Sequence, residues 1–242
     1  MHDMHCHLGF MENGEEVAAD ALAAGSLLFA NTVTPDEWRD ARERFALFDN
    51  VVVGFGMHPW WVDERWRIEE ELDGAQPDVI GEAGLDLGRR HAETRALQLR
   101  TFEAIASWAG SRGGKLLSLH SVHAAAETLE ILERTGALES CTCIFHWFTG
   151  PSDLLKRAVQ AGCLFSAGPR MLATGKGREY VKAIPVGQLL LETDAPPEQG
   201  QRYSYAELRA ELESAAASIA GIKGADALEV IEATSRKLLA LT

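Results

Sequence analysis

The chain has 242 residues, of which 46% are hydrophobic and 24% are charged, and its formal net charge is −13. No apolar run approaches the ~20 residues of a membrane span, so no membrane partner is expected. The acidic balance disfavours an extended nucleic-acid-binding face, which is normally basic, although bound cations would neutralise several of the carboxylates.

Eight short apolar runs, each followed by a helix-like stretch, are predicted to be β-strands. In chain order these runs are Asp3–His7, Ser26–Asn31, Val51–Met57, Val79–Glu82, Leu116–His120, Cys141–His146, Cys163–Ala167 and Leu189–Asp194. Their nearly continuous apolar character is typical of strands that helices cover. Eight β-then-α units predict an α/β protein whose parallel sheet closes into a TIM-type (β/α)8 barrel. No linker, low-complexity tract or internal repeat interrupts the chain, so residues 1–242 are predicted to form a single domain.

Helices are predicted between these runs and after the last one. The segment Glu93–Ala109 carries its apolar residues on one helical stripe. Ser204 and Glu207 have the spacing of a capping box that opens a helix. Asp226 and Glu229 repeat this signal and predict a last helix near the C-terminus.

Residues that commonly bind metals stand at the ends of five of the eight runs. They are His5, His7, Glu82, His120, His146 and Asp194. An open, doubly wound sheet has the same local pattern, but it spreads its strand ends along a line at ~4.8 Å per strand. A barrel brings all strand ends to one mouth. The distribution of these residues therefore favours the barrel.

The alternation of side chains along a strand predicts which residues point inward. Residues two apart share a face, so His5 and His7 are expected to point into the barrel together. By the same rule, Cys141 and Cys143 lie on the face opposite to His146. This Cys-x-Cys pair is therefore expected to be buried packing rather than a metal clamp.

The mixed nitrogen and oxygen donors suit zinc, manganese, iron, nickel or, less well, magnesium. Six ligands exceed the four of a single tetrahedral zinc, so two divalent cations that share Glu82 are predicted. Such a pair can activate a water and stabilise the displaced oxygen. Glu192 shares the face of Asp194, and it is expected either to support that site or to pair with a cation.

Six short motifs come in the order that is found in one known family. They are Asp3-Met4-His5-Cys6-His7-Leu8, Gly56-Met57-His58-Pro59, Ile80-Gly81-Glu82-Ala83-Gly84-Leu85-Asp86, Leu119-His120-Ser121, Phe145-His146-Trp147-Phe148-Thr149-Gly150 and Leu191-Glu192-Thr193-Asp194-Ala195-Pro196. From about residue 3 to residue 200, the chain thereby resembles the TatD-like metal-dependent hydrolases, a variant of the amidohydrolase barrel. The resemblance implies two divalent ions, and many members of the family are described as deoxyribonucleases that cut phosphodiester bonds.

The resemblance also implies roles for single residues. By this resemblance, His5, His7 and Asp194 would bind the first ion, and His120 and His146 would bind the second. Glu82 would bridge the two ions. Asp194 is implied as the proton acceptor for the attacking water, whose pKa the metals would lower. His58 is predicted to contact the leaving group or the phosphate, with a loop histidine held by a turn as the alternative.

The chain departs from the family mainly in residues that would contact a substrate. Val122 stands where an Arg commonly follows the His-Ser of the fifth strand. The loop Pro197–Arg202 is shorter and less basic than in many members, and Thr234-Ser235 replaces an Asn near the C-terminus. Because phosphate contacts supply most of the affinity for polynucleotides, these losses should weaken DNA binding.

Two kinds of side chain could still bind a nucleic acid. The remaining candidates for a phosphate contact are Arg170, Lys176 and Arg202. For each of them, a solvated surface charge is the alternative. Of the three, Arg202 is the predicted substrate contact. Trp60, Trp61 and Trp147 follow two of the candidate histidines at the predicted mouth. Stacking of a base on such a ring contributes ~1–3 kcal/mol, and packing of one loop on another is the alternative for Trp60 and Trp61.

The predicted function is that of a metal-dependent hydrolase that cleaves ester bonds, with a phosphodiester in DNA as the first choice of substrate. The first alternative is a small cyclic amide, lactone or phosphoester, favoured by the acidic surface and by Val122. The second alternative is a metal-binding barrel without turnover, which the complete ligand set disfavours. Zinc or manganese is the expected metal, at two cations per subunit.

The sequence also predicts a cytoplasmic location. Its first residues lack the basic and apolar leader of a secreted protein. The four cysteines, at positions 6, 141, 143 and 163, are too few and too irregularly spaced for a disulfide framework. No obligate protein partner is indicated.

Overall fold

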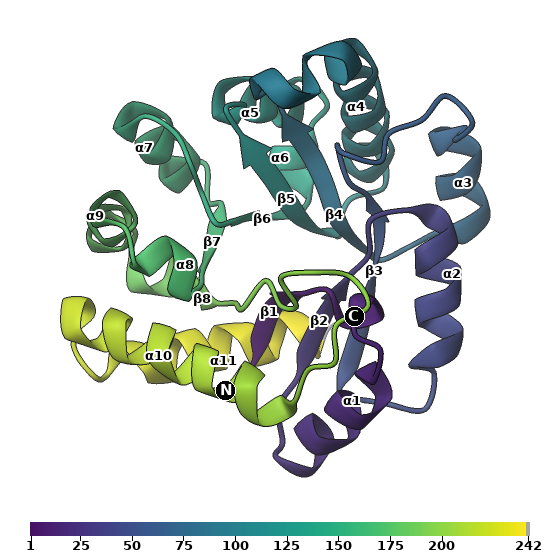
Figure 1. Cartoon of the computed structure of the whole chain (residues 1–242). Helices are drawn as coiled ribbons and strands as arrows, with labels where there is room; N and C mark the ends of the chain where they lie inside the picture. Colours follow the sequence, from purple (N-terminus) through teal and green to yellow (C-terminus); the bar gives the residue numbers. More distant parts are fainter. Residues whose placement is uncertain (241–242) are drawn as a thin grey trace. The chain divides into compact units, whose positions relative to one another are not determined.

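The computed structural model describes residues 1–240, in which eight strands follow one another through the sheet in chain order (Figure 1). The strands are β1 (Asp3–Cys6), β2 (Leu28–Asn31), β3 (Val51–Met57), β4 (Val79–Asp86), β5 (Leu116–Val122), β6 (Thr142–His146), β7 (Leu164–Ala167) and β8 (Leu189–Leu191). The pairs β1–β2, β3–β4, β4–β5, β5–β6 and β7–β8 are parallel. Eight parallel strands in this order confirm the predicted α/β class.

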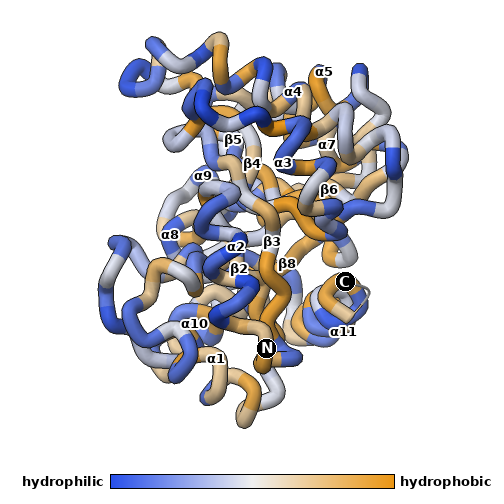
Figure 2. The backbone as a smooth tube through the Cα atoms, turned by 90° about the vertical axis from the view of Figure 1, so that its right-hand side faces the viewer, coloured by the Kyte–Doolittle hydropathy of each residue, from blue (hydrophilic) through white to orange (hydrophobic). Residues whose placement is uncertain are grey.

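Helices connect successive strands. They are α1 (Gly14–Ala23), α2 (Pro35–Arg44), α3 (Ile68–Ala75), α4 (Arg95–Arg112), α5 (Ala125–Arg134), α6 (Ala137–Ser140), α7 (Ser152–Gln160), α8 (Pro169–Leu172), α9 (Gly175–Ala183), α10 (Tyr205–Lys223) and α11 (Ala227–Leu239), with short 3-10 turns η1 (Leu8–Phe10), η2 (Arg89–Thr94) and η3 (Val186–Gln188). Figure 2 shows β6 and β8 in the orange of hydrophobic residues, whereas α2 carries much of the blue of hydrophilic ones. Among the described residues, no helix combines the length and the apolar character needed to cross a membrane.

The chain forms two compact units. The first contains residues 1–31, 39–53 and 165–240, and the second contains residues 32–38 and 54–164. In the first, β1 pairs with β2 and β7 pairs with β8. In the second, β4, β5 and β6 lie side by side and α4 packs against β4 (Figure 1). The single domain expected over residues 1–242 stays a prediction.

Only β3 has the predicted bounds, and the largest differences are at the ends of β4 and β8. β4 continues past Glu82 to Asp86, so it carries a further acidic residue on the same side of the strand. The predicted strand Leu189–Asp194 is too long, because β8 ends at Leu191. The backbone of Asp194 has a φ of 57°, which is left-handed and leaves the strand.

The two predicted helix starts near the C-terminus have different outcomes. Ser204 forms the predicted capping box with Glu207, since each side chain bonds to the backbone N–H of the other residue. Asp226 has helical backbone angles and its side chain makes no capping hydrogen bond. The last helix is therefore present as predicted, but the prediction of a capping box at its start is wrong.

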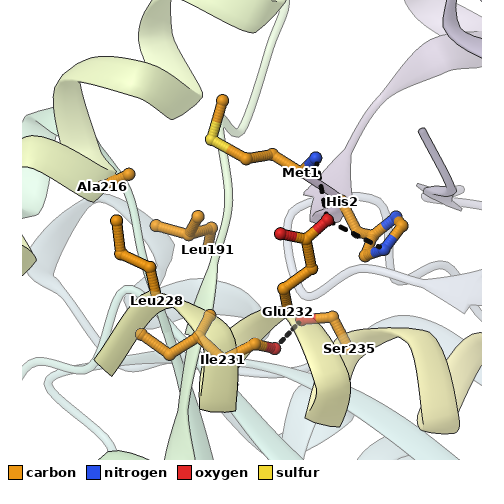
Figure 3. A pocket seen from close by; sticks show the side chains of 8 residues that line it. All are labelled: Met1, His2, Leu191, Ala216, Leu228, Ile231, Glu232 and Ser235. Atoms are coloured by element: carbon orange, nitrogen blue, oxygen red, sulfur yellow. Dashed lines mark hydrogen bonds and ion pairs between the residues drawn. The ribbon is translucent and has the colours of Figure 1, made fainter. Parts of the chain in front are cut away.

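A buried histidine, His2, lines a cavity of about 90 Å³ in the first unit (Figure 3). His2 is 2% exposed, and its Nδ1 accepts a hydrogen bond of 3.0 Å from the backbone N–H of Leu27. Its Nε2 lies 3.9 Å from a carboxylate oxygen of Glu232. Burial, together with the nearby positive charges of the Met1 amine and Arg236, lowers the pKa of His2 to about 4.

This buried imidazole predicts a loss of stability in acid. The pKa of His2 in the folded protein lies below the unfolded value of 6.5. Its contribution to the free energy of unfolding is therefore complete above pH 6.5 and is lost as the pH falls to about 4. The loss from this group amounts to about 3 kcal/mol. His2→Asn keeps an acceptor for Leu27 and has no titrating ring, so its free energy of unfolding should fall less over this interval. Urea unfolding at pH 7 and pH 4.5 measures the difference, and equal losses in both proteins would contradict it.

Candidate metal centre

The first unit brings three of the predicted ligands together. Nε2 of His7 lies 3.5 Å from Oδ1 of Asp194, and Nε2 of His5 lies 3.9 Å from the same oxygen. One ligand atom from each of the three residues lies within 4.8 Å of the others. All three side chains are buried or half-buried. The His-x-His spacing and the residue after β8 therefore form one cluster.

The backbone of β1 holds this cluster. The N–H of Asp194 donates to the carbonyl of His5 at 2.8 Å. The buried carboxyl group of Asp3 accepts hydrogen bonds from the His5 N–H and from both the N–H and the hydroxyl of Thr193. Burial outweighs these bonds and raises the pKa of Asp3 to about 8. A residue of β1 thus fixes the two segments that carry the ligands.

The orientation of His7 suits a metal ligand. Its Nδ1 lies 3.1 Å from the backbone carbonyl of Asn31, which can only accept a hydrogen bond. The ring proton of a neutral His7 is therefore on Nδ1, which leaves the lone pair on Nε2 directed to Asp194. A backbone acceptor behind a ligating imidazole is the usual arrangement in metal sites.

Arg170 and Glu192 each have a hydrogen-bond partner near the ligand cluster. Arg170 in α8 donates from Nη1 to Oδ2 of Asp194 at 3.1 Å and from Nη2 to its carbonyl at 3.0 Å. Glu192 accepts a hydrogen bond from the hydroxyl of Ser166. Arg170 is thus the cation beside the predicted proton acceptor, whereas Glu192 bonds to a neutral hydroxyl.

The second unit gathers three histidines around one carboxylate. Glu82 is 1% exposed, and its Oε1 lies 2.6 Å from Nδ1 of His120, 3.2 Å from Nε2 of His146 and 3.4 Å from Nε2 of His58. At Gly84, β4 and β5 come so close that a Cβ would lie 2.1 Å from the carbonyl oxygen of His120. Only glycine permits this approach, which brings Glu82 and His120 together.

His58 differs from the other histidines in its tautomer. Its Nδ1 accepts a hydrogen bond of 3.1 Å from the backbone N–H of Trp60. The proton of a neutral His58 is therefore on Nε2, which lies 3.2 Å from Nδ1 of His120. A ligand atom of His58 lies within 4.8 Å of ligand atoms of Glu82 and His120, but a protonated Nε2 donates hydrogen bonds and does not bind metal. The contact of His58 with a leaving group or phosphate stays a prediction. The turn held by Trp60 also agrees with the alternative reading of His58.

Sequence reasoning missed the role of Asp86. Its Oδ2 accepts from Nε1 of Trp60 at 2.7 Å and lies 3.9 Å from Nε2 of His120, and its Oδ1 accepts from the N–H of Gly88. Burial would raise the pKa of Asp86, but these donors hold it well below its usual range. The two-residue spacing of Glu82, Gly84 and Asp86 along one strand was the available signal.

The carboxylates also act on His120. Burial by itself would lower its pKa, but the negative charge of Glu82, the nearby carboxylate of Asp86 and the hydrogen bond to Glu82 raise it. Its Nε2 is buried and has no hydrogen-bond partner. An imidazole between two carboxylates, with one nitrogen unsatisfied, is a suitable ligand for a cation.

The donor sets of both clusters fit a divalent metal. Two ligands of one tetrahedral ion, each bonded at roughly 2.0–2.2 Å, lie about 3.3 Å apart. The separations of 3.5 Å for His7 and Asp194 and of 3.2 Å for His146 and Glu82 are close to this value. Imidazole and carboxylate together suit zinc and manganese.

Other predicted residues lie outside these clusters. Arg202 is exposed, and its guanidinium pairs with Glu16 at 3.0 Å and with Glu12 at 3.6 Å. Lys176 lies with its ammonium 5.5 Å from the ring of Tyr180. Cys143 is a buried free thiol, and among the described residues no cysteine belongs to a group that could hold a metal. Cys143 is thus buried as expected, whereas Cys141 is only half-buried.

The sequence is similar to those of known hydrolases. The family model "TatD related DNase" matches residues 2–241. The deoxyribonuclease TATDN3 of Homo sapiens is 28% identical over 267 residues, which cover 99% of this chain and 93% of the human protein. The uncharacterized metal-dependent hydrolase TatD of Mycobacterium tuberculosis is 32% identical over 212 residues, which cover 81% of this chain and 80% of that protein.

Solved structures share the fold. The crystal structure of YJJV, a TatD homolog from Escherichia coli K12, matches with a TM-score of 0.81 at 21% identity and covers 98% of this chain and 97% of its own. A TatD-family hydrolase from Entamoeba histolytica matches with a TM-score of 0.80 at 16% identity, with the same coverage. With eight parallel strands in chain order, this similarity confirms the predicted TIM-type (β/α)8 barrel.

Proposed function

The chain belongs to the family of TatD-related DNases, and from this membership we propose that it hydrolyses phosphodiester bonds in DNA. It is a metal-dependent hydrolase that acts on ester bonds, as relatives named deoxyribonuclease and metal-dependent hydrolase are. The observation that carries the proposal is the buried carboxylate of Glu82 with three imidazoles around it. A carboxylate at this depth needs positive charge or several donors, which a divalent cation would supply.

We assign the metals as the sequence predicts. His5, His7 and Asp194 would hold one cation, His120 and His146 would hold a second, and Glu82 would be the shared ligand, with zinc or manganese as the metal. The grouping of His5, His7 and Asp194 supports the first set. The separations of 2.6 Å between His120 and Glu82 and of 3.2 Å between His146 and Glu82 support the second. When bound, the divalent cations would lower the pKa of the attacking water and offset negative charge on the phosphoryl oxygens.

The protein's own residues would handle the protons and the substrate. Asp194 accepts the proton of the attacking water, and Arg170, which donates to Oδ2 and to the carbonyl of Asp194, holds that carboxylate in position. His58 donates from Nε2 to the leaving oxygen, because its Nδ1 is occupied by the Trp60 N–H. Arg202 is a weaker candidate for the substrate contact, since Glu12 and Glu16 already pair with it.

The test is cleavage of a labelled single-stranded oligonucleotide by protein reloaded with zinc or manganese. Cleavage into shorter products, lost in a chelator and recovered when metal is returned, is the expected result. Full turnover by the metal-stripped protein would overturn the mechanism. No cleavage by a fully loaded protein would overturn DNA as the substrate.

Small substrates are the second candidate, because cations for a long polyanion are few. Val122 replaces the usual Arg, and the net charge is −13. The same loaded protein should therefore be assayed on a cyclic amide, a lactone and a phosphoester. A kcat/KM on one of these that exceeds the value on DNA at least tenfold would favour this candidate. Binding of metal without turnover of any of them would favour a metal-binding barrel.

A cytoplasmic location is also proposed. The four cysteines are free thiols in the described structure. Free thiols are usual in a reducing compartment, whereas secreted proteins commonly join them in disulfides.

A further inference from the structure

Aromatic rings of the second unit are exposed beside the histidine cluster. Trp60 is 52% exposed and Trp61 is 37% exposed. The ring of Trp60 lies 5.0 Å from that of His58 and 5.9 Å from that of His120, edge to face in both cases. Adjacent exposed apolar side chains often mark a binding site, whereas a single one is common on any surface. Here they adjoin the side chains to which we assign the chemistry.

Trp60 is held in one orientation although half of its surface is exposed. Its Nε1 donates to Asp86 at 2.7 Å, and Asp86 is itself fixed by the N–H of Gly88. The ring of His91 is stacked on Trp60 at 5.3 Å and 11°, and Trp61 is stacked beside it at 5.9 Å and 28°. We call Trp60, Trp61 and His91 the aromatic shelf. A ring that is already ordered loses little conformational entropy when a ligand stacks on it.

The sequence left loop packing open as an explanation for these tryptophans. The bond to Asp86 and the stack on His91 account for the position of Trp60, but not for its exposure of 52%. A ring that served only to pack a loop would place its apolar surface against protein. The exposed part of the shelf is therefore available to a planar ligand.

A nucleobase is the planar group that matches this position. Every base has an aromatic face, so stacking contributes affinity without any sequence preference. A base inside a duplex is already stacked on both faces, and the shelf would accept only an unpaired one. Stacking also uses no positive charge, which fits a chain with few cations for phosphate contacts.

We propose that the aromatic shelf is a base-stacking subsite, which binds an unpaired base of the nucleotide next to the scissile phosphodiester. This inference rests on the proposed function and deepens it. The shelf would supply affinity for the nucleoside, while the histidine and carboxylate clusters would act on the phosphate.

The test compares two ligands that carry the same phosphate monoester, of which only one has a base. Thymidine 5′-monophosphate and methyl phosphate are titrated by calorimetry into zinc-loaded protein. The nucleotide is expected to bind about 5- to 150-fold more tightly, which corresponds to ~1–3 kcal/mol of stacking. Equal dissociation constants for the two ligands would overturn the inference.

Variants separate stacking from the hydrogen bond to Asp86. Trp60→Leu should lose most of the preference for the nucleotide, whereas Trp60→Phe keeps a ring and should retain most of it. Loss of the preference in both variants would assign the effect to the bond with Asp86 and overturn the stacking role. Trp66→Leu is the matched control, because Trp66 is in the same loop with its ring against the guanidinium of Arg65. It should bind both ligands as the unchanged protein does.

The outcome is separable from the test of the proposed function. Oligonucleotide cleavage without a preference for the nucleotide would leave the function intact and remove the subsite. A preference that depends on Trp60, found in a protein that cleaves no DNA, would leave the subsite and remove DNA as the substrate. Thermal unfolding of each variant checks that the fold is retained.

Discussion

Replacing Glu82 with glutamine is expected to lower kcat/KM on a phosphodiester by about 10³-fold, because the charge that we propose to hold the cations would be lost. A metal contributes several kcal/mol of charge stabilisation to the transition state, and 4 kcal/mol corresponds to about 10³ in rate. Glu82 is 1% exposed and lies within 3.4 Å of three imidazole nitrogens. A neutral amide at this position is a poor metal ligand and leaves His120 and His146 without their carboxylate.

Metal content is the second measurement that tests the Glu82→Gln variant. The unchanged protein should hold two divalent ions per chain by elemental analysis, and Glu82→Gln should hold at most one. Glu82→Asp keeps the charge on a shorter side chain and should recover part of the metal and part of the rate. Glu69→Gln, at an exposed position of α3, is the matched control for loss of a carboxylate. Full metal content with a rate within tenfold of the unchanged protein would contradict the role of Glu82.

Replacing Asp194 with asparagine is expected to lower kcat by a factor on the order of 10²–10⁴, the range associated with removal of a positioned general base. Oδ1 of Asp194 lies 3.5 Å from His7 and 3.9 Å from His5, and Oδ2 accepts from Arg170 at 3.1 Å. Asparagine has a similar shape and can still accept from Arg170 through its amide oxygen. It cannot accept a proton from the attacking water, so catalysis should suffer more than the fold.

The partition of the effect distinguishes catalysis from binding. Asp194→Asn should change kcat much more than KM, and its thermal unfolding should stay close to that of the unchanged protein. Glu198→Gln, in the exposed loop that follows, is the matched control and should keep normal kinetics. An Asp194→Asn protein that keeps more than a tenth of kcat would show that another residue accepts the proton.

Several features of the fold and the clusters could be predicted because they depend on local patterns. The nearly continuous apolar runs predicted all eight strands, since a strand covered by helices has no polar face. The two-residue spacing predicted that His5 and His7 would point the same way. The same rule predicted that Cys143 would be buried, as it is.

Other features depended on partners that no local pattern contains. Arg170 and Arg202 look alike in the sequence, but Arg170 bonds to Asp194 and Arg202 to Glu12 and Glu16. The partner of each guanidinium depends on which carboxylates the fold places near it. The capping box predicted at Asp226 is absent because the backbone there is already helical, and an N-cap requires an extended residue.

The sequence by itself determined the class of fold, the residue types at the strand ends and the faces on which they lie, because hydrophobic period and side-chain alternation are properties of short segments. Only the tertiary structure decided the tautomer of His58, the placement of Asp86 behind Trp60 and the exposure of that ring. Each of these depends on hydrogen-bond partners or solvent contact set by the folded chain. Distances between residues remote in sequence follow from the packing of whole strands and helices, which no window of the sequence describes.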